Sequence, residues 1–379
     1  MQALIIAIPL LYTFSNLSST AAYKMEALCA SNFGVHRDVL QFRTLDKKPV
    51  CETPTDVVIR VVYTELNPVD LHKLRGSPQQ EGQAITNAPF IPGYGGSGVV
   101  EEVGKEAPSS LKGNRVAFMA DPSRKGSYAT YIAVDHRLVA EIPSDRISLK
   151  DAATVPLAGC TAYESLFKLG LGKDTVVSDD ATFLVVGGAG GVGSWAISLA
   201  KAWHSNLKVI ATGSSQASKE WCTGRGADQV LSHEEILDTL GGGREGSVSH
   251  ILCLTEPTPS LFGKLSDLIQ PYGTICLVVA GASIKGLDLG FCFFKAANVV
   301  METVFTSIRT NFKSTVPSKE IVEILELLFT ETLKAPLSPQ QESAEGERDW
   351  KGAMEAGGIL DILAVGHTRG KLILKIGSD

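Results

Sequence analysis

Three glycines in one stretch have the spacing of a phosphate-binding turn. Gly188, Gly190 and Gly193 follow the pattern G-x-G-x-x-G, with an apolar run before them at 183–186 and a helix-like apolar repeat after them. The first glycine permits a tight turn, the second lets the backbone approach a pyrophosphate, and the third lets the helix pack on the strand. The pattern alone is weak evidence, because glycine-rich turns also form for structural reasons. Its place between strand and helix favours dinucleotide binding, with the backbone of Gly191 and Val192 in the same turn.

The residues that follow the next predicted strand indicate which dinucleotide binds. An acidic residue about 20 residues beyond the glycine pattern would hold the ribose 2′-hydroxyl of NAD(H). The chain instead has Gly213, Ser214 and Ser215, with Lys219 close behind. Hydroxyls, free amides and a cation suit a 2′-phosphate, which a carboxylate would repel. The sequence therefore favours NADP(H), although Lys219 taken alone is typical of a solvated helix lysine.

A glycine turn of this kind needs a parallel sheet, and the second half of the chain has the pattern of one. Alternating strands and helices indicate a doubly wound parallel sheet. A helix is expected over 318–333, a polar loop over 335–348 and a last strand over 371–376 that returns to the first domain. The strands of the parallel sheet are predicted at 183–186, 207–212, 229–231, 250–254, 274–280 and 298–305.

The first half of the chain is rich in short β segments. Their close spacing, with glycine and proline between them, suggests a barrel-like or folded-over antiparallel body from Met25 to about Pro156. Helical segments broken at Pro156 and Gly159 are expected over 151–169. The clearest strands are predicted at 56–64, 98–103, 115–119 and 127–134.

Composition and charge exclude several classes of function. At 379 residues, with 44% hydrophobic and 20% charged residues, the chain has enough material for two domains with real cores. A net charge of −6 without a basic run argues against nucleic acid as a partner. Seven cysteines, never paired as C-x-x-C, fit a reducing compartment and argue against a cysteine-rich structural zinc site.

The first 24 residues differ from the rest. An apolar run from Ala3 to Leu11 resembles the core of a signal peptide, but no Lys or Arg precedes it. The run is also too short to cross a bilayer as a helix. We expect an extension outside the fold, either an upstream start or a weak targeting sequence. A cytoplasmic protein without membrane association is the expectation.

Several motifs occur in the order typical of the medium-chain dehydrogenase/reductase superfamily. The chain is most similar there to zinc-free quinone oxidoreductases, meaning zeta-crystallin relatives and zinc-type alcohol dehydrogenase-like proteins, over essentially residues 25–377. The motifs are NPVDLHKLRG (67–76), PGYGGSGVVEEVG (92–104), the stretch 156–167, GGAGGVG (187–193), GADQVLSH (226–233) and HTRGKLILKIG (367–377).

The resemblance implies an α/β protein in which a GroES-like, β-rich catalytic domain accompanies a Rossmann domain. It also implies a homodimer paired through the 298–305 strand. The implied division is an extension at 1–24, the catalytic domain at 25–156 and 307–379, and the NADP(H)-binding domain at 157–306.

Catalytic zinc is expected to be absent. In the superfamily's alcohol dehydrogenases the metal needs a cysteine in the segment that matches 67–70, and a His-Glu pair where this chain has Tyr94 and Gly95. A catalytic zinc site needs three protein ligands, and these positions supply no thiolate or imidazole. Without a Lewis acid a plain ketone is a poor hydride acceptor, whereas quinones and enones spread the developing charge.

Three residues are candidates for the catalytic hydrogen bond or proton. His72 lies in the segment that flanks the nicotinamide in relatives, and its pKa range suits proton donation, although a surface histidine is equally expected. Tyr94 could donate to a substrate oxygen, but the glycines around it favour a tight backbone turn. Asn67 is the safer candidate, because the matching asparagine borders the cofactor in relatives; the alternative is an Asx turn before Pro68.

Four further residues are implied as cofactor contacts by the resemblance. Thr161 matches a threonine beside the nicotinamide, with an ordinary helix-start hydroxyl as the alternative. His233 stands where relatives have a Tyr or His near the adenosine phosphate. Arg369 and Lys371 match a C-terminal basic pair that reaches the cofactor phosphates or shapes the cleft. Exposed histidines and exposed basic residues before a strand are common, so both readings stay open.

The function that these features favour is reduction of quinones or α,β-unsaturated carbonyls by NADPH without zinc. One alternative is an enoyl-thioester reductase of the fatty-acid or polyketide type, which should have a basic-rimmed acyl channel. Another is an NADPH-binding, crystallin-like protein with little turnover. The expected partner is a small-molecule substrate.

Overall fold

The computed structural model describes residues 24–310, 316–342, 350 and 352–378. The extension expected at the amino terminus therefore lies outside the described residues, except for Lys24. The first strand, β1 (Met25–Cys29), begins at the second methionine, as predicted. Within the described part of the chain, every helix is too short or too polar to cross a membrane. The cytoplasmic location stays a prediction.

The second half of the chain forms a sheet in which six described strands all run parallel, and this confirms the doubly wound prediction. Counted along the chain, their spatial order is 3-2-1-4-5-6, so the order reverses beside the first strand. In that order the strands are β10 (Gln229–Leu231), β9 (Lys208–Thr212), β8 (Thr182–Val186), β11 (Val248–Cys253), β12 (Ile269–Leu277) and β13 (Asn298–Met301).

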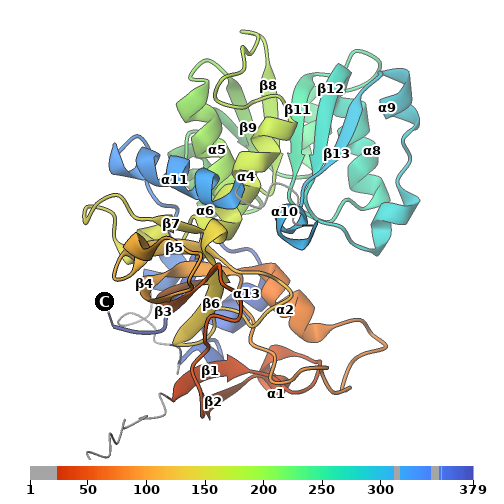
Figure 1. The fold of residues 1–379 in the computed structure, drawn as a ribbon. Helices are drawn as coiled ribbons and strands as arrows, with labels where there is room; N and C mark the ends of the chain where they lie inside the picture. The colour runs from red at the N-terminus through yellow and green to blue at the C-terminus, as the bar shows by residue number, and fades with distance from the viewer. Residues whose placement is uncertain (1–23, 311–315, 343–349, 351, 379) are drawn as a thin grey trace, which may run out of the picture.

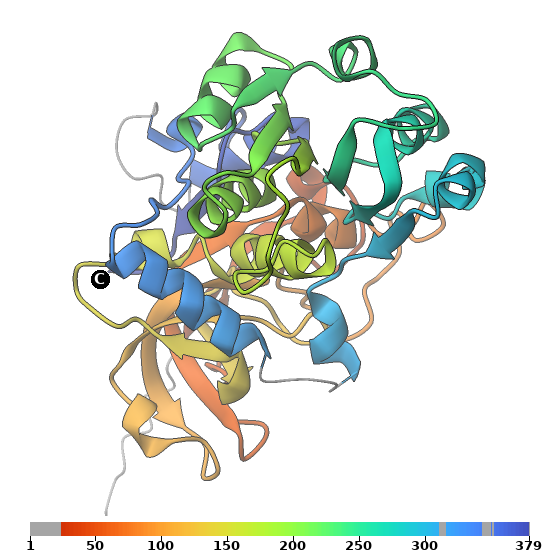
Figure 2. The same cartoon turned by 90° about the horizontal axis from the view of Figure 1, so that it is seen from above.

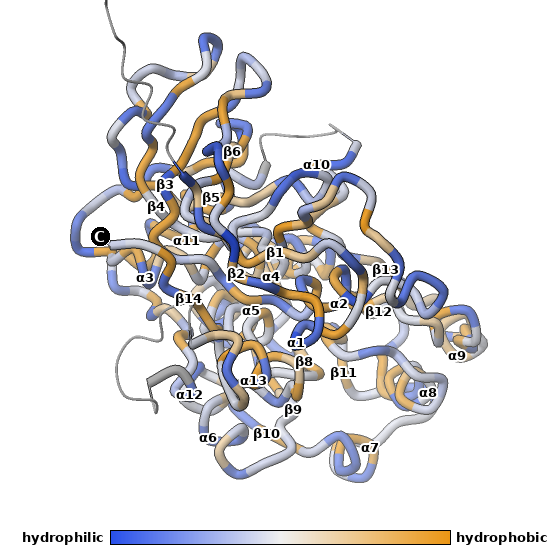
Figure 3. Tube along the Cα trace, turned by 90° about the horizontal axis from the view of Figure 1, so that it is seen from below, coloured by the Kyte–Doolittle hydropathy of each residue, from blue (hydrophilic) through white to orange (hydrophobic). Residues whose placement is uncertain are grey.

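Alternate residues of β8 enter two separate cores. Phe183 and Val185 pack on the face covered by α5 (Gly191–Trp203), whereas Leu184 and Val186 pack with α7 (Glu235–Leu240) and α8 (Pro259–Leu268). Helices thus bury both faces of the sheet, and this explains why its strands read as continuous apolar runs. Figure 3 shows hydrophobic residues concentrated along the strands of the interior.

The first half of the chain forms an antiparallel sheet, as predicted, and the last strand joins it. In this sheet β14 (Leu372–Lys375) pairs with β3 (Asp56–Leu66), so that Leu372 lies opposite Leu66. The confirmed return of the chain end brings the C-terminal residues to the β-rich body. The other members are β4 (Gly95–Val103), β5 (Arg115–Met119), β6 (Tyr131–Asp135) and β7 (Val139–Glu141), while β1 pairs with β2 (Gln41–Leu45) in a separate hairpin.

Several predicted boundaries were wrong. The helix expected over 318–333 spans Val316–Phe329, and the strand expected at 98–103 starts at Gly95. The strand expected at 298–305 ends at Met301, and β12 starts at Ile269 rather than 274. The strand expected at 127–134 becomes β6 only from Tyr131. Gly159 does not break the helix α4 (Pro156–Lys168), because its own N–H bonds to the Val155 carbonyl at 2.8 Å.

Gly159 has a packing role instead. A Cβ at this position would lie 3.1 Å from Ile324 Cδ1 of α11 (Val316–Phe329), so the glycine allows the two helices to approach closely. Pro156 stands in the first turn of α4, where the missing N–H costs no helical hydrogen bond. Figure 2 shows α11 lying along the β-rich body and beside α4.

Shorter helices complete the described chain. The loop expected over 335–348 contains the single-turn helix α12, and its other residues from 343 lie outside the described part. The remaining helices are α1 (His36–Val39), α2 (Pro68–Arg75), α3 (Leu149–Ala152), α6 (Gln216–Gly224), α9 (Gly290–Phe294), α10 (Phe305–Thr310), α12 (Pro339–Glu342) and α13 (Ile359–Val365). Single 3₁₀ turns lie at Ser109–Leu111, His136–Leu138, Ala282–Gly286 and Gly352–Met354.

Candidate cofactor and catalytic site

The glycine-rich turn leaves the carboxyl end of β8 and starts α5. The left-handed backbone that makes the turn is at Gly187, with φ of +86°, one residue before the predicted pattern. Gly188 is needed for another reason, since a Cβ there would lie 2.8 Å from the Ala211 Cβ of β9. The Thr212 hydroxyl accepts a 2.8 Å hydrogen bond from the Gly187 N–H and pins the turn to the neighbouring strand.

The two other glycines of the pattern have different surroundings. A Cβ on Gly193 would lie 2.6 Å from the carbonyl oxygens of Gly187 and Gly188, so only glycine lets α5 pack this closely. A Cβ on Gly190 would meet no described atom nearer than the Gly187 carbonyl oxygen at 3.6 Å. Packing therefore requires the glycine at 193, while the space beside Gly190 suits a ligand that approaches the backbone.

The amino terminus of α5 fits a phosphate. Gly190 is its N-cap, and no described side chain caps the helix there. The first N–H groups of a helix, here including those of Gly191 and Val192, have no carbonyl partner within the helix. Together with the helix dipole they form an anion-binding end. The turn therefore fits the pyrophosphate of a dinucleotide.

The C-terminal segment lies directly against this turn. The Gly370 N–H donates a 2.8 Å hydrogen bond to the Ala189 carbonyl, and Gly370 and Gly190 form a parallel bridge. The Arg369 N–H is held by Gln340 Oε1 at 2.9 Å. The next residue, Lys371, runs so close to Gly191 that a Cβ there would lie 2.5 Å from Lys371 Cδ. The fold thus brings the backbone at 369–371 beside the glycine turn, and a phosphate contact of Arg369 stays a prediction.

The Lys371 ammonium was predicted to contact a cofactor phosphate, but it is bound by protein groups instead. It is buried, and it pairs with Glu65 Oε2 at 2.8 Å. It also donates to Asn67 Oδ1 at 2.6 Å and to the Leu66 carbonyl at 3.0 Å. A lysine ammonium has three protons, and three protein acceptors already surround this one. Its aliphatic stem lines the turn, whereas its charge belongs to the β-rich body.

Asn67 is the predicted catalytic residue that lies closest to this centre. It is the N-cap of α2 and only 3% exposed. Because Lys371 Nζ occupies the Oδ1 atom, the amide orientation is fixed and Nδ2 remains the donor. Nδ2 is buried without a hydrogen-bond partner among the described residues. A buried donor without a partner is costly, and this fits a ligand acceptor at that point.

The other two catalytic candidates are placed less favourably. Tyr94 is fully buried, its hydroxyl lacks a partner within the described chain, and burial with the nearby Asp70 charge raises its pKa far above the ordinary value. His72 is exposed on α2, and its side chain forms no hydrogen bond with the described residues. The helix turns the next residue inward instead.

That residue, Lys73, was missed by the sequence reasoning. Its Nζ donates to the Pro122 carbonyl at 3.0 Å and lies 4.9 Å from the centre of the Tyr94 ring. It is also 5.9 Å from the Phe305 ring, over which the Arg309 guanidinium lies at 5.6 Å. Burial and Arg309 lower the pKa of Lys73. Two cations from distant parts of the chain thus meet around one aromatic pair.

Two buried carboxylates were also missed. Asp70 Oδ2 accepts from the Asn67 N–H at 2.7 Å and from the Tyr128 hydroxyl at 2.9 Å, and burial raises the pKa of Asp70 to about 7. The N-x-x-D spacing of a capping box would have found it. Glu65 Oε1 accepts from the Leu157 N–H of α4 at 2.6 Å. Glu65 stands in a strand-like run that gives no sign of this role.

The residues predicted around the adenosine ribose gather at the carboxyl ends of β9 and β10. Gly213 donates its N–H to the Leu231 carbonyl at 2.9 Å, while Ser214 and Ser215 are exposed. Ser215 also caps α6. Lys219 pairs with Glu235 at 3.4 Å. His233 is exposed on the same edge.

Thr161 already has a partner inside its own helix. The hydroxyl donates to the Leu157 carbonyl at 2.7 Å, and the side chain is 5% exposed. This is the ordinary helix contact that the sequence left open as an alternative. A cofactor contact of Thr161 stays a prediction.

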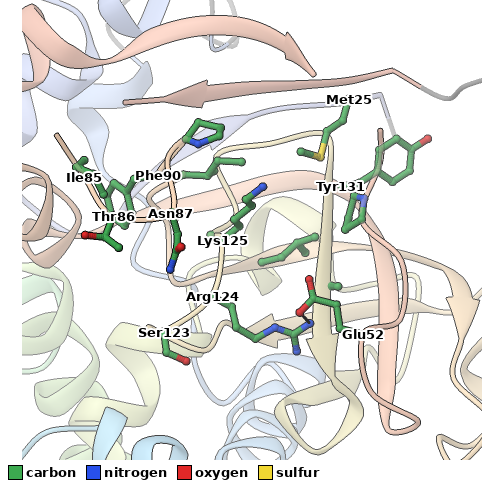
Figure 4. A pocket seen from close by; sticks show the side chains of 16 residues that line it. Met25, Glu52, Ile85, Thr86, Asn87, Phe90, Ser123, Arg124, Lys125 and Tyr131 are labelled. Atoms are coloured by element: carbon green, nitrogen blue, oxygen red, sulfur yellow. Dashed lines mark hydrogen bonds and ion pairs between the residues drawn. The ribbon is translucent and has the colours of Figure 1, made fainter. Parts of the chain in front are cut away.

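Neither a group of metal ligands nor the pocket drawn in Figure 4 coincides with this centre. Among the described residues, no three His, Cys, Asp or Glu side chains are grouped so as to hold a metal ion. A pocket of about 420 Å³ lies elsewhere in the β-rich body, and none of the predicted site residues lines it (Figure 4). Arg124 on its wall pairs with Asp56 through two 2.9 Å hydrogen bonds.

Comparison with known proteins agrees with this architecture. Residues 53–144 match the alcohol dehydrogenase GroES-like domain. A zinc-type alcohol dehydrogenase-like protein of Staphylococcus aureus is 35% identical over 236 residues, which are 62% of this chain and 67% of that protein. The 2-methylene-furan-3-one reductase of Solanum lycopersicum is 38% identical over 183 residues, 47% of this chain and 44% of that protein.

A solved structure shows the same fold over almost the whole chain. The quinone oxidoreductase of Coxiella burnetii superposes with a TM-score of 0.73 at 22% sequence identity. The superposition covers 94% of this chain and 100% of that chain. The β-rich body and the parallel sheet therefore occur together in that protein as they do in this one.

Proposed function

The chain belongs to the medium-chain dehydrogenase/reductase superfamily, in its quinone oxidoreductase-like branch, and we propose that it reduces quinones or α,β-unsaturated carbonyls with NADPH and without zinc. Its relatives support the broader class, which is an oxidoreductase with a nicotinamide cofactor. The observation that carries the proposal is the meeting of the glycine turn with Asn67 and Lys371. It joins a phosphate-binding backbone to a buried amide donor, whose orientation Lys371 fixes.

The choice of NADPH rests on the edge of the parallel sheet. Ser214, Ser215 and Lys219 follow β9, where an NAD-binding protein of this fold has an acidic residue. Exposed hydroxyls and an ammonium group are suitable partners for a 2′-phosphate. Arg369, beside the glycine turn, adds a second cation near the phosphates.

The chain's own residues then prepare the acceptor. The reduced nicotinamide supplies a hydride when it is bound. Lys371 fixes the Asn67 amide, so that Nδ2 donates a hydrogen bond to an acceptor oxygen on which negative charge develops. Such a preorganised donor in a water-poor site typically contributes a factor of about 100 to the rate. Asp70 holds the Asn67 backbone and keeps the amide in place.

The donor set at this centre supports a mechanism without zinc. The carboxylates at this centre already have protein partners, since Glu65 pairs with Lys371 and Asp70 accepts from the Asn67 N–H. The other groups, an amide and an ammonium group, are poor zinc ligands compared with thiolate, imidazole and carboxylate. The Lys371 charge also lies within 3 Å of both the Glu65 carboxylate and the Asn67 amide, so that it would repel a divalent ion. Conjugated acceptors suit such a site, since the negative charge that develops on hydride addition is delocalised and one hydrogen bond stabilises it. The enone named in the tomato relative is an acceptor of this kind.

One assay tests the proposal. Oxidation of NADPH is followed with 9,10-phenanthrenequinone, an enone and crotonyl-CoA in parallel, each before and after addition of a strong chelator and of Zn²⁺. We expect turnover of the quinone or the enone that neither addition changes. Binding of NADPH without any turnover would favour the crystallin-like alternative, and a requirement for Zn²⁺ would exclude the mechanism.

One observation favours the second candidate, an enoyl-thioester reductase. Lys73 and Arg309 lie 5.9 Å and 5.6 Å from the Phe305 ring, which packs on Tyr94, so two cations stand near one of the catalytic candidates. Phosphate groups of a CoA or carrier thioester would find a basic rim there. Turnover of crotonyl-CoA that exceeds turnover of the enone, and that falls in an Arg309→Gln variant, would select this function.

A homodimer formed through the edge strand β13 is also proposed. β13 ends the parallel sheet and pairs with β12 alone among the described strands. Beside it, Phe293 and Phe294 are 84% and 88% exposed, and Met301 is 51% exposed. An unpaired edge beside exposed aromatic rings is a surface that a second copy would cover. Light scattering after gel filtration should give twice the mass of one chain for the wild type. The Val300→Pro variant should give the mass of a single chain.

A further inference from the structure

A carboxylate reaches the edge proposed to bind the 2′-phosphate, but it does not come from the end of β9, where sequence patterns look for one. Glu235 comes from α7, after the neighbouring strand β10, and its Oε2 lies 3.4 Å from Lys219 Nζ. Lys219 is the cation that follows Ser214 and Ser215 on the same sheet edge. A carboxylate from one crossover thus reaches the cation of another.

Glu235 has a structural role that fixes its position. Its Oε2 accepts from the Ser232 N–H at 2.7 Å, and its own N–H donates to the Ser232 hydroxyl at 3.2 Å. This reciprocal pair closes the turn that leads into α7. The carboxylate is therefore held beside Lys219 by the backbone rather than by the lysine.

We infer that Glu235 sets how strongly this chain prefers NADPH over NADH, by competing with the 2′-phosphate for Lys219. This inference rests on the proposed function, since it concerns the same cofactor site. The phosphate carries a charge near −2 at neutral pH, and the hydrogen bond from the Ser232 N–H holds the Glu235 carboxylate beside Lys219. Binding of NADPH must then tolerate a fixed negative charge a few ångströms away, whereas NADH carries no phosphate there and is indifferent.

The hydrogen bond from Ser232 also makes a clean variant available. The amide oxygen of glutamine accepts a backbone hydrogen bond as a carboxylate oxygen does, so Glu235→Gln removes the charge and retains an acceptor for the Ser232 N–H. Glu234→Gln is the matched control. It removes the same charge at the neighbouring position, where the side chain is exposed and takes no part in the Lys219–Glu235 ion pair. Lys219→Gln removes the cation for which the two anions compete.

The experiment measures the Kd of NADPH and of NADH by cofactor fluorescence on the full chain. At low salt, Glu235→Gln should tighten NADPH about 3- to 10-fold and leave NADH unchanged. The gain should shrink at about 0.5 M salt, because screening weakens charge repulsion. It should also shrink in the Lys219→Gln background, and Glu234→Gln should reproduce wild type.

Two results would overturn the inference without touching the proposed function: unchanged NADPH affinity in Glu235→Gln, or equal gains for NADPH and NADH. An undiminished gain in the Lys219→Gln background would also overturn it, since competition for Lys219 would not be the cause. A wild-type chain that binds neither cofactor would end both proposals together.

Discussion

Lys371 and Glu65, more than 300 residues apart in the chain, form a buried ion pair with Nζ 2.8 Å from Oε2. Glu65 also accepts from the Leu157 N–H at the start of α4, and the Lys371 stem passes the glycine turn at Gly191. One pair of side chains therefore joins the β-rich body, the cofactor turn and α4, which is the helix immediately before the parallel sheet. The position of Asn67 depends on the same lysine.

This pair should matter greatly when one partner is removed. Glu65→Gln should lower the free energy of unfolding by about 3–5 kcal/mol, because it leaves a buried ammonium without a counter-charge. Lys371→Met should cost a similar amount, whereas the double variant Glu65→Gln/Lys371→Met should recover most of the loss. Urea unfolding monitored by tryptophan fluorescence measures all four proteins.

An exposed ion pair provides the control for that series. Arg115 and Asp145 also lie 2.8 Å apart, but the Asp145 side chain is fully exposed. Asp145→Asn should leave the unfolding midpoint where it is, since solvent screens such pairs. Equal losses in Asp145→Asn and Glu65→Gln would show that burial does not decide how much an ion pair matters to this fold.

Substitutions of two glycines of the cofactor turn, Gly193 and Gly190, should distinguish effects on stability from effects on NADPH binding. Gly193→Ala places a Cβ 2.6 Å from two backbone carbonyl oxygens, so it should lose about 1–3 kcal/mol or more of stability. Gly190→Ala meets no such obstacle and has φ of −69°, which alanine adopts freely, so it should keep its melting temperature. Its NADPH affinity should nevertheless fall at least tenfold. Thermal melts and fluorescence titration distinguish the two effects, and an unchanged affinity in folded Gly190→Ala would argue against phosphate binding at this turn.

Substitutions of the two buried catalytic candidates, Asn67 and Tyr94, should have different effects on kcat. Asn67→Asp keeps an acceptor for Lys371 but removes the Nδ2 donor, so kcat should fall about 100-fold with a smaller change in the Kd of NADPH. Tyr94→Phe removes a hydroxyl that has no partner among the described residues, so it should keep kcat and gain about 1 kcal/mol of stability. Steady-state kinetics with whichever quinone or enone is turned over provide the test. A large loss of kcat in Tyr94→Phe would restore Tyr94 as the donor.

A buried glutamate on α11 should make stability depend on pH. Burial and the neighbouring Glu164 raise the pKa of Glu320 from 4.5 to about 9. The folded chain therefore holds a proton that the unfolded chain has released between these values, and the free energy of unfolding should fall as pH rises from about 4.5 to about 9. The slope for one group is at most about 1.4 kcal/mol per pH unit.

Glu320→Gln should flatten that slope and stabilise the protein at pH 8. Glutamine stays neutral at every pH, so folding no longer depends on keeping a proton at this buried position. Glu326→Gln, exposed on the same helix, should behave as wild type. Urea midpoints recorded from pH 5 to 9 give the comparison, and parallel curves for Glu320→Gln and wild type would show that another group titrates.

Local chemistry was enough for the sequence to predict the parallel sheet and its glycine turn. Gly188, Gly190 and Gly193 impose a turn wherever a strand is followed by a helix, and alternating apolar runs determine the βα order. Even so, the left-handed residue proved to be Gly187. Strand ends at 301 and 269 were missed as well, because hydrogen-bonding neighbours decide where a strand stops.

Contacts between distant residues decided the rest of the site. The sequence names Asn67 and Lys371 but cannot show that their side chains meet, and it gives no hint that Glu65 pairs with the same lysine. It chose His72 over Lys73, although the helix turns the lysine inward and leaves the histidine in solvent. Spacing along a chain fixes which residues share a turn or a helix face. Burial, charge partners and hydrogen-bond saturation arise only when separate elements pack, and these determined which candidate has a free donor and which is merely exposed.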